Sequence, residues 1–328
     1  MPENLLDLLK EAAGMYISGE EMSKALGVTR AAVWKQVERL RQQGYVIQAA
    51  TNQGYRLVSC PEVLDRERIL SLGEHPWKNR ITVLETVDST NSLAKRQALQ
   101  GAPHGTVYVS DEQTGGRGRQ GRSFISPRGK GLYLSVLLRP ACAPAEVAHV
   151  TAMAGVAACD AVEAAAGVRP GIKWTNDLLL GEKKLAGILS ELSVEWESST
   201  LEYLVIGIGI NCAQLPGDFP EELREKAGSL LSETGSKPDR DLLAAALIRR
   251  LGDLSRELLT GKAQWLQQYA RDCVTIGRKV RILRQGRERL GTATGIDENG
   301  ALIVRYETGE TGVVFSGEVS VRGENGYI

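Results

Sequence analysis

The chain has 328 residues, of which 42% are hydrophobic and 5% aromatic, and its 40 basic residues balance its 40 acidic residues. This composition is typical of a globular protein with two or three domains, and it excludes a disordered or a supercharged chain. The zero net charge argues against nucleic-acid binding over the whole surface, although it leaves room for local basic patches.

The cysteines and the absence of targeting segments indicate a reducing compartment. The five cysteines are scattered, odd in number and without CxxC spacing: Cys60, Cys142, Cys159, Cys212 and Cys273. Such residues are typical of reduced, mostly buried thiols. The chain shows no signal-peptide pattern at its start and no apolar run of about 18 residues, the length that a membrane span needs. We therefore expect a soluble cytoplasmic protein with no membrane partner.

The N-terminal segment, residues 1–62, has the pattern of a winged helix-turn-helix domain. A leucine-rich amphipathic helix opens the segment, and Ser18 and Glu21 have the spacing of a capping box at the start of a second helix. After a glycine-containing turn, a third helix covers about residues 30–43. Two short strand-like runs on either side of a turn at Asn52 predict the hairpin that forms the wing.

Charge within this segment favours DNA binding. Residues 22–60 hold six basic side chains and a single acid, Glu38. The exposed start of the third helix is where a recognition helix touches base edges. The predicted DNA-binding residues there and on the wing are Thr29, Arg30, Ala31, Trp34, Lys35 and Arg56. The alternatives are a basic helix face that is merely solvated and a winged helix that binds protein.

The rest of the chain divides into two β-containing segments. Residues 63–270 alternate strand-like and helix-like runs, which predicts a mixed α+β sheet covered by helices. The expected strands are 81–87, 106–110, 131–138, 177–180, 185–192 and 201–208, and the expected helices are 92–100, 145–166 and 240–259. Residues 271–328 contain short β-rich runs at 279–283, 301–306 and 311–315, separated by turns, and predict a small barrel.

The most informative motif is the run from Gly115 to Arg122, Gly-Gly-Arg-Gly-Arg-Gln-Gly-Arg, which we call the arginine loop. Glycines let the backbone pass close to a ligand, and guanidinium groups stay charged. In an extended stretch Arg117 and Arg119 point to one side, and Arg122 reaches over from the other. Guanidinium forks suit phosphate oxygens, so the run predicts a clamp for a polyphosphate or an adenylate. A flexible surface loop or an RGG-like nucleic-acid patch is the alternative.

Four further motifs accompany the arginine loop: Asp88 to Asn91, Lys173 to Asp177, Lys183 to Leu189, and Gly207 to Asn211. In this order and spacing the motifs resemble those of the biotin protein ligases. With the helix-turn-helix, the whole chain resembles the bifunctional ligases that also repress the biotin operon. The resemblance implies an α+β fold with three domains. These are a winged helix-turn-helix (1–62), a central mixed-sheet domain of the biotin and lipoate ligase type (63–270) and a C-terminal SH3-like β-barrel (271–328).

The implied reaction requires fixed positive charge. Joining a carboxylate to the α-phosphate of ATP brings two anions together, and Lys184 can act there as a point charge near the developing acyl phosphate. The resemblance implies that this lysine contacts both the ligand carboxylate and the phosphoryl oxygen. With Arg117 and Arg119 it forms the predicted catalytic set. A Lys-Lys pair in a hairpin is otherwise a solvated turn, and Lys183 keeps that interpretation.

The predicted biotin site joins hydroxyl, amide and glycine residues. The resemblance implies that Ser89, Thr90 and Gln113 hydrogen-bond the ureido ring of biotin, although Ser89 can equally cap the following helix. Glycine weakens a strand unless something approaches closely, and a flat bicyclic ligand on the sheet explains the strand glycines. The full predicted set is Ser89, Thr90, Asn91, Gln113, Arg117, Gly118, Arg119, Lys184, Gly187 and Gly207.

The adenylate end is also assigned by resemblance. Its predicted residues are Arg119, Arg122, Phe124, Asn176, Asn211 and Ser229. Phe124 stands where tryptophan is common in the family and keeps an apolar lid. Asp177, with Asn176, is expected to help hold Mg²⁺ on the phosphates. For Lys173, in the same motif, a role in the site and a structural pairing with a neighbouring acid are equal alternatives.

The resemblance implies a reaction in two steps. Biotin and MgATP give biotinoyl-5′-AMP and pyrophosphate, and a lysine of a biotin carboxyl carrier protein then attacks the mixed anhydride. The adenylate also serves as co-repressor, so that a homodimer, joined through the central sheet near residues 189–208, binds operator DNA of biotin genes. The alternatives are a lipoate-type ligase, which would lack the winged helix, and a non-catalytic biotin-sensing transcription factor. The latter would not need the arginine loop together with Lys184.

Overall fold

The computed structural model describes residues 4–42, 45–51, 53–59, 63–195, 199–284, 287–315 and 319–323. The chain forms two compact units, Met1–Val63 and Leu64–Ile328. Three features expected from the sequence lie outside the described residues: Cys60, Asn52 of the wing turn, and the boundary at residue 62. The second unit contains both the central and the C-terminal segments, so the boundary at residue 270 stays a prediction.

The N-terminal unit is a winged helix-turn-helix. It contains α1 (Leu5–Glu11), α2 (Gly19–Leu26), α3 (Arg30–Gln42) and a hairpin of β1 (Val46–Ala50) and β2 (Gly54–Ser59). The predicted capping box is confirmed, because Glu21 N donates to Ser18 Oγ at 3.1 Å and Ser18 N donates to Glu21 Oε2 at 2.9 Å. Leu9, Met22, Val33 and Ile47 join the helices and the hairpin in one small buried core.

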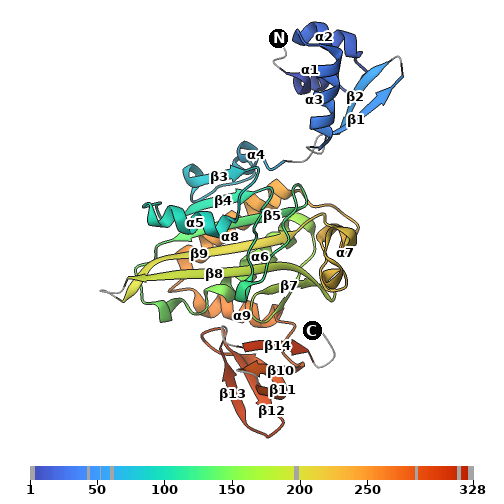
Figure 1. The fold of residues 1–328 in the computed structure, drawn as a ribbon. Helices are drawn as coiled ribbons and strands as arrows, with labels where there is room; N and C mark the ends of the chain where they lie inside the picture. The colour runs from blue at the N-terminus through green and yellow to red at the C-terminus, as the bar shows by residue number, and fades with distance from the viewer. Residues whose placement is uncertain are drawn as a thin grey trace. The chain divides into compact units, whose positions relative to one another are not determined.

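A mixed sheet of seven strands forms the centre of the second unit (Figure 1). Its order is β3-β4-β5-β9-β8-β7-β6, and only β3 and β4 run parallel. The strands are β3 (Ile81–Leu84), β4 (Thr106–Ser110), β5 (Gly131–Leu138), β6 (Gly171–Lys173), β7 (Asp177–Leu180), β8 (Lys183–Glu195) and β9 (Thr200–Asn211). All six expected strands are present, and β6 is the additional one. With three residues, it is too short to show a hydrophobic period.

The expectation that the edge strands near residues 189–208 join a dimer needs correction. Strand β9 pairs with β5 on one side and with β8 on the other, so it is not an edge. Strand β8 pairs with β7 only over Lys183–Gly187, and no described strand pairs with the far side of its remaining residues. The open edge is therefore confined to the second half of β8.

Helices cover both faces of this sheet (Figure 1). One face carries α5 (Thr90–Leu99), and the other carries α6 (Val150–Ala166), α8 (Arg240–Glu257) and α9 (Lys262–Asp272). Side chains alternate accordingly along β9: Tyr203 and Val205 pack under α5, whereas Leu204 and Ile206 belong to the main core. By the same alternation Gly207 lies on the α5 face. Because glycine has no side chain, the sheet surface is open at this position.

The remaining helical segments are short. They are α4 (Arg66–Ser71), α7 (Leu230–Thr234) and the 3₁₀ turns η1 (Lys78–Arg80), η2 (Arg119–Gly121), η3 (Pro144–Val147), η4 (Pro216–Asp218) and η5 (Glu221–Leu223). The segment Pro144–Ala166, which includes α6, is long and apolar enough to cross a membrane by length and composition alone. However, 72% of its apolar window is buried inside the unit, as in a core helix.

The C-terminal residues form a five-stranded antiparallel sheet. It contains β10 (Lys279–Arg284), β11 (Arg287–Ile296), β12 (Leu302–Tyr306), β13 (Thr311–Val314) and β14 (Val319–Gly323), in the order β13-β12-β11-β10-β14. Over the described residues the sheet does not close on itself, and β13 and β14 are its edge strands. This arrangement is compatible with the expected SH3-like barrel. Trp174 anchors it to the central sheet, because its Nε1 donates to Gly300 O at 3.0 Å.

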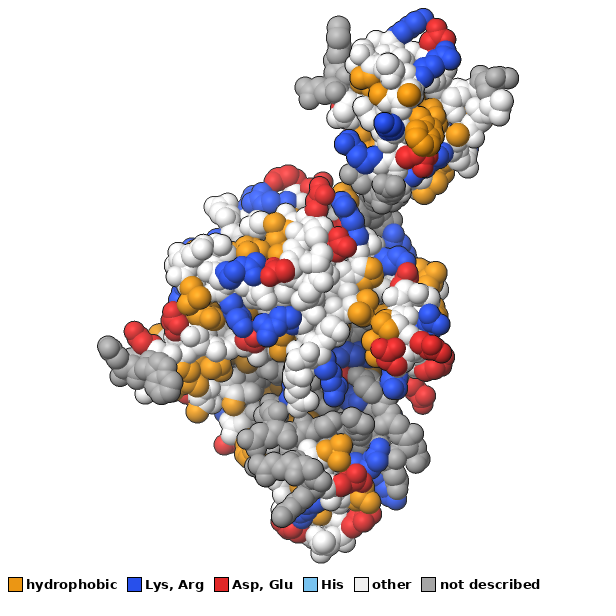
Figure 2. Space-filling view, in the orientation of Figure 1, with side chains coloured by type: hydrophobic (Ala, Val, Ile, Leu, Met, Phe, Trp, Pro, Cys, Tyr) orange, Lys and Arg blue, Asp and Glu red, His pale blue; other side chains and the backbone are white. Residues whose placement is uncertain are grey.

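Charges on the second unit are intermixed. On the face drawn in Figure 2, basic and acidic side chains lie among one another, as the balance of 40 basic and 40 acidic residues leads one to expect. This face therefore presents no broad field of a single sign, and specific anion binding depends on local clusters.

Candidate functional site

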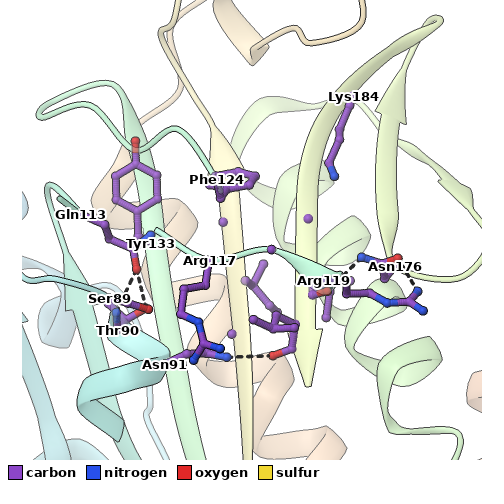
Figure 3. Close-up of a pocket in the computed structure, with 17 residues that line it drawn as sticks. Ser89, Thr90, Asn91, Gln113, Arg117, Arg119, Phe124, Tyr133, Asn176 and Lys184 are labelled. Carbon is purple, nitrogen blue, oxygen red and sulfur yellow. Dashed lines mark hydrogen bonds between the residues drawn. The ribbon is translucent and has the colours of Figure 1, made fainter. Parts of the chain in front are cut away.

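A pocket opens on the α5 face of the central sheet, over the glycines of β8 and β9 (Figure 3). It is lined by Ser89, Thr90, Asn91, Gln113, Arg117, Gly118, Arg119, Phe124, Tyr133, Asn176, Lys184, Gly187, Ile188, Leu189, Gly207, Ile208 and Gly209. Every residue predicted to bind biotin lies in this set, together with Phe124 and Asn176 of the predicted adenylate end. The fold thus brings together residues that are as far apart in the sequence as Ser89 and Gly209.

One end of the pocket is an uncharged hydrogen-bonding cluster at the start of α5. Thr90 N donates to Gln113 Oε1 at 2.9 Å, and Gln113 Nε2 donates to Ser126 Oγ at 2.9 Å. Ser89 caps α5, since its Oγ accepts from Ser92 N at 3.4 Å, and it also lines the pocket. Ser89 can therefore cap α5 and face the pocket at the same time, and its contact with biotin stays a prediction. The cluster presents amide and hydroxyl groups of the kind that suit a small polar, uncharged ring.

Asn91 explains the glycine at position 207. Its Nδ2 donates to Leu189 O at 3.1 Å, and its Oδ1 lies 2.6 Å from Ser135 Oγ. A Cβ atom added to Gly207 would come within 1.9 Å of Asn91 Oδ1. This glycine therefore makes room for the Asn91 side chain, a reason that the sequence pattern did not indicate, and its contact with a flat ligand stays a prediction.

Phe124 covers the other two glycines. A Cβ atom on Gly209 would lie 2.6 Å from the Phe124 ring, and one on Gly187 would lie 3.5 Å from it. The ring meets Tyr133 edge to face, with centroids 6.4 Å apart. In Figure 3 Phe124 lies between the polar cluster and the cationic end, so it forms an apolar lid over the middle of the pocket.

The opposite end of the pocket carries two cations. Lys184 Nζ lies 2.7 Å from Asp177 Oδ1, and Arg119 Nη1 donates to Asn176 Oδ1 at 2.9 Å. Burial, and to a lesser extent the charge of Arg122, lowers the pKa of Arg119 below its ordinary value, although Asp177 opposes this. Arginine stays protonated at neutral pH, so partial burial leaves it a poorly hydrated charge that attracts anions. Lys183 does not line the pocket and lies 3.7 Å from Glu233.

The donor set at this end suits a metal that arrives with its ligand. Asp177 pairs its carboxylate with the pocket's lysine, and Asn176 adds an amide oxygen. Among the described residues no group of three or more His, Cys, Asp and Glu is placed to hold an ion. Mg²⁺ commonly uses one or two carboxylates plus substrate phosphates. The pair of Asp177 and Asn176 fits that pattern. The same pair does not fit a metal centre held by protein ligands alone.

Arg117 turns away from this cationic end. Its Nη1 donates to Glu191 Oε1 at 3.4 Å, and the same carboxylate accepts from Lys95 Nζ at 2.7 Å and from Asn91 Nδ2 at 3.0 Å. Burial raises the pKa of Glu191, but these hydrogen bonds and the charges of Lys95 and Arg117 outweigh it, so that the pKa lies below its ordinary value. Glu191 is therefore an ionised partner of the arginine loop that the sequence analysis did not identify.

Three residues predicted for the adenylate end do not line the pocket: Arg122, Asn211 and Ser229. Asn211 Nδ2 donates to Gly228 O at 2.9 Å, and Ser229 Oγ donates to Gln214 O at 2.6 Å. These bonds order a segment that flanks Lys184, because Gly228 N donates to Lys184 O at 3.0 Å. Asn211 and Ser229 therefore stabilise the segment next to Lys184 without lining the pocket.

Lys173 is 8% exposed on β6 and does not line the pocket, and none of the three histidines lines it. Tyr133 does line it, although the sequence analysis passed over it. The alternation of Tyr133 and Ser135 with leucines on β5 is the signal that points both side chains to one face.

The residues predicted to bind DNA cluster at the start of α3 and on the wing. Thr29 caps α3, because its Oγ1 accepts from Ala32 N at 3.2 Å, whereas Ala31, Trp34 and Lys35 are exposed. Trp34 leaves 54% of its surface exposed. Arg30 is held by Glu20 at 2.5 Å. On the wing, Arg56 lies over the Tyr16 ring, 4.9 Å from its centroid.

Comparisons with known proteins cover most of the chain. A model of the biotin/lipoate A/B protein ligase family matches residues 83–211, an HTH domain model matches residues 3–56, and a model of the biotin protein ligase C-terminal domain matches residues 275–322. The chain is 36% identical over 313 residues to the bifunctional ligase/repressor BirA of Bacillus spizizenii, covering 94% of each chain. It is 32% identical over 327 residues to BirA of Escherichia coli, covering 98% of this chain and 97% of that one.

The chain is also similar in fold to solved biotin protein ligases. The biotin protein ligase from Aquifex aeolicus in complex with biotin and ATP superposes with a TM-score of 0.64 at 30% identity. The match covers 75% of this chain and 99% of that chain. The fold described above is thus similar to that of a protein solved with biotin and ATP.

Proposed function

The chain belongs to the biotin protein ligase family, in its bifunctional ligase/repressor branch, and on that premise we propose how its two units perform the two functions. The pocket on the α5 face activates biotin with ATP and passes it to a lysine of a biotin carboxyl carrier protein. The winged helix-turn-helix represses genes of biotin synthesis or uptake when the adenylate is bound. Cytoplasmic location and a homodimer on operator DNA are parts of the same proposal.

One observation carries the enzymatic half of the proposal: the two ends of a single pocket differ in chemistry. The cluster of Thr90 and Gln113 is uncharged, whereas Arg119 and Lys184 are cations. The ureido ring of biotin needs donors and acceptors without charge, and its carboxylate needs a cation where it meets the α-phosphate. Phe124 lies between these ends, against Gly209, where it shields the reacting groups from water.

In the first step the biotin carboxylate attacks the α-phosphorus of ATP, and pyrophosphate leaves. Lys184 is held by Asp177 at the cationic end, where its ammonium can stabilise the negative charge that builds on the phosphoryl oxygens. Arg119 adds a fixed guanidinium beside Asn176. Mg²⁺, which Asp177 and Asn176 would help to hold, neutralises the departing pyrophosphate when it is bound.

In the second step the acceptor lysine, in its neutral amine form, attacks the carbonyl of biotinoyl-5′-AMP and AMP leaves. No side chain of the enzyme forms a covalent bond, which agrees with a pocket lined by no cysteine and no histidine. The arginine loop folds over the adenylate between the two steps and protects the anhydride from hydrolysis.

The test of the enzymatic half is biotin-dependent ATP–pyrophosphate exchange, followed by transfer of biotin to a biotin carboxyl carrier protein. Exchange with biotin but not with lipoate is the expected result. Exchange with lipoate alone would favour a lipoate-type ligase. Biotin binding without exchange would indicate a sensing transcription factor, and would overturn the catalytic assignment of Lys184 and Arg119.

A further inference from the structure

The carboxylate of Glu191 joins the pocket wall to the arginine loop. Strand β8 places Leu189 and Glu191 on the α5 face with Gly187, because side chains alternate along the strand. Glu191 itself lies outside the pocket lining. Its Oε2 accepts from Asn91, a lining residue of α5, and its Oε1 accepts from Arg117 of the loop.

Two cations share this one carboxylate unequally. Lys95 Nζ lies 2.7 Å from Glu191 Oε1, whereas Arg117 Nη1 lies 3.4 Å from the same atom. The Arg117 side chain is 47% exposed, and that of Glu191 is 21% exposed. The ion pair of Arg117 is therefore longer and more exposed to solvent than that of Lys95. A competing anion can replace Glu191 as the partner of Arg117 at little cost.

We propose that Glu191 is a positioning residue that holds Arg117 in the ligand-free protein and yields it to the acid group of the ligand, while Lys95 keeps Glu191 neutralised after the exchange. Breaking an ion pair is costly when it leaves a mostly buried carboxylate without a partner. Here the departure of Arg117 leaves Glu191 bonded to Lys95 and Asn91, so the loop can change partners without that cost.

This inference rests on the proposed function, since it takes the acid group of biotin as the competitor for Arg117. It predicts opposite effects for two substitutions in one cluster. Glu191→Gln keeps the bond from Asn91 but removes the charge that competes for Arg117, so biotin binding becomes tighter. Lys95→Met leaves Arg117 as the remaining cation on Glu191, so the loop is held more firmly and biotin binding becomes weaker.

The experiment is isothermal titration of the full chain with biotin, without ATP, at low and moderate salt. The expected change in Kd is about two- to fivefold in opposite directions for the two variants, which is the range that a partly exposed ion pair is worth. Both changes should shrink as salt screens the pairs. In an Arg117→Met background, Glu191→Gln should have no effect, because the residue for which it competes is absent.

Structural damage moves both variants in the same direction, so a Kd that rises in both would overturn the proposal. Equal Kd values for Glu191→Gln and the unchanged chain would also overturn it. If the unchanged chain binds biotin normally, these outcomes affect the role of Glu191 alone. A chain that binds no biotin would remove the proposed function and this inference with it.

Discussion

The ammonium of Lys184 lies 2.7 Å from the carboxylate of Asp177, on the neighbouring strands β8 and β7. The pair sits at the cationic end of the pocket, and the Lys184 side chain is 30% exposed. The lysine is therefore oriented before any ligand arrives, which lowers the reorganisation required when charge develops on a phosphoryl group. Its sequence neighbour Lys183 points to Glu233 instead and offers a matched control.

Lys184→Ala should fold and lose adenylate synthesis by about 100-fold or more, the cost of removing a group that stabilises transition-state charge. The measurement is the rate of biotin-dependent pyrophosphate exchange at saturating biotin and ATP. Lys183→Ala, which removes an equal charge outside the pocket, should retain a rate close to that of the unchanged chain. An unchanged rate in Lys184→Ala would refute its catalytic role.

Gly207→Ala should lower stability and weaken biotin binding together. The new methyl group would meet Asn91 Oδ1 at 1.9 Å, and overpacking of this kind costs about 1–3 kcal/mol. Urea denaturation measures the free energy of unfolding. Gly217→Ala is the control, since no atom lies within 4 Å of the added methyl group there. Adding Asn91→Ala to Gly207→Ala should restore much of the stability, and a failure to do so would mean that another contact is limiting.

The arginine loop should resist protease when biotin and ATP are both present. Seven of the eight residues from Gly115 to Arg122 are Gly or Arg, so few apolar contacts oppose local opening. In the structure the loop is held by backbone bonds such as Gly118 N to Arg122 O at 2.7 Å. Limited trypsin digestion should cut there, and cutting should slow sharply with both ligands. Equal cleavage with and without ligands would contradict the clamp.

Binding to DNA of biotin-synthesis genes should require biotin and ATP together, because one winged helix offers a small interface and a dimer matches two half-sites. The open half of β8 is the expected dimer surface, and it exposes 50% of Leu192 and 36% of Val194. Leu192→Arg should therefore reduce dimers and DNA binding while pyrophosphate exchange continues. Gel-shift and sedimentation measurements test this. Equal DNA binding with and without the ligands would show that the switch is absent.

The sequence by itself determined the local features of this protein. The Ser18–Glu21 capping box, the glycine turn before α3 and the six expected strands all follow from patterns within a few residues. The ligand motifs could also be recognised, because each is a short run and their order and spacing resemble those of a known family. The motifs alone could not show that the arginine loop, β8 and β9 line one pocket.

The tertiary structure decided which distant side chains meet. Asn91 and Glu191 are one hundred positions apart, yet they bond at 3.0 Å because β8 passes under α5. The same packing places Asn91 where a side chain at position 207 would clash with it, and it brings Arg117 to Glu191. Asn211 and Ser229 lie outside the pocket lining for the same reason. Sequence patterns report the period of one element, whereas these contacts depend on the register of β8 with β9 and on the position of α5 above them. Those relationships arise only when the sheet and its covering helix assemble.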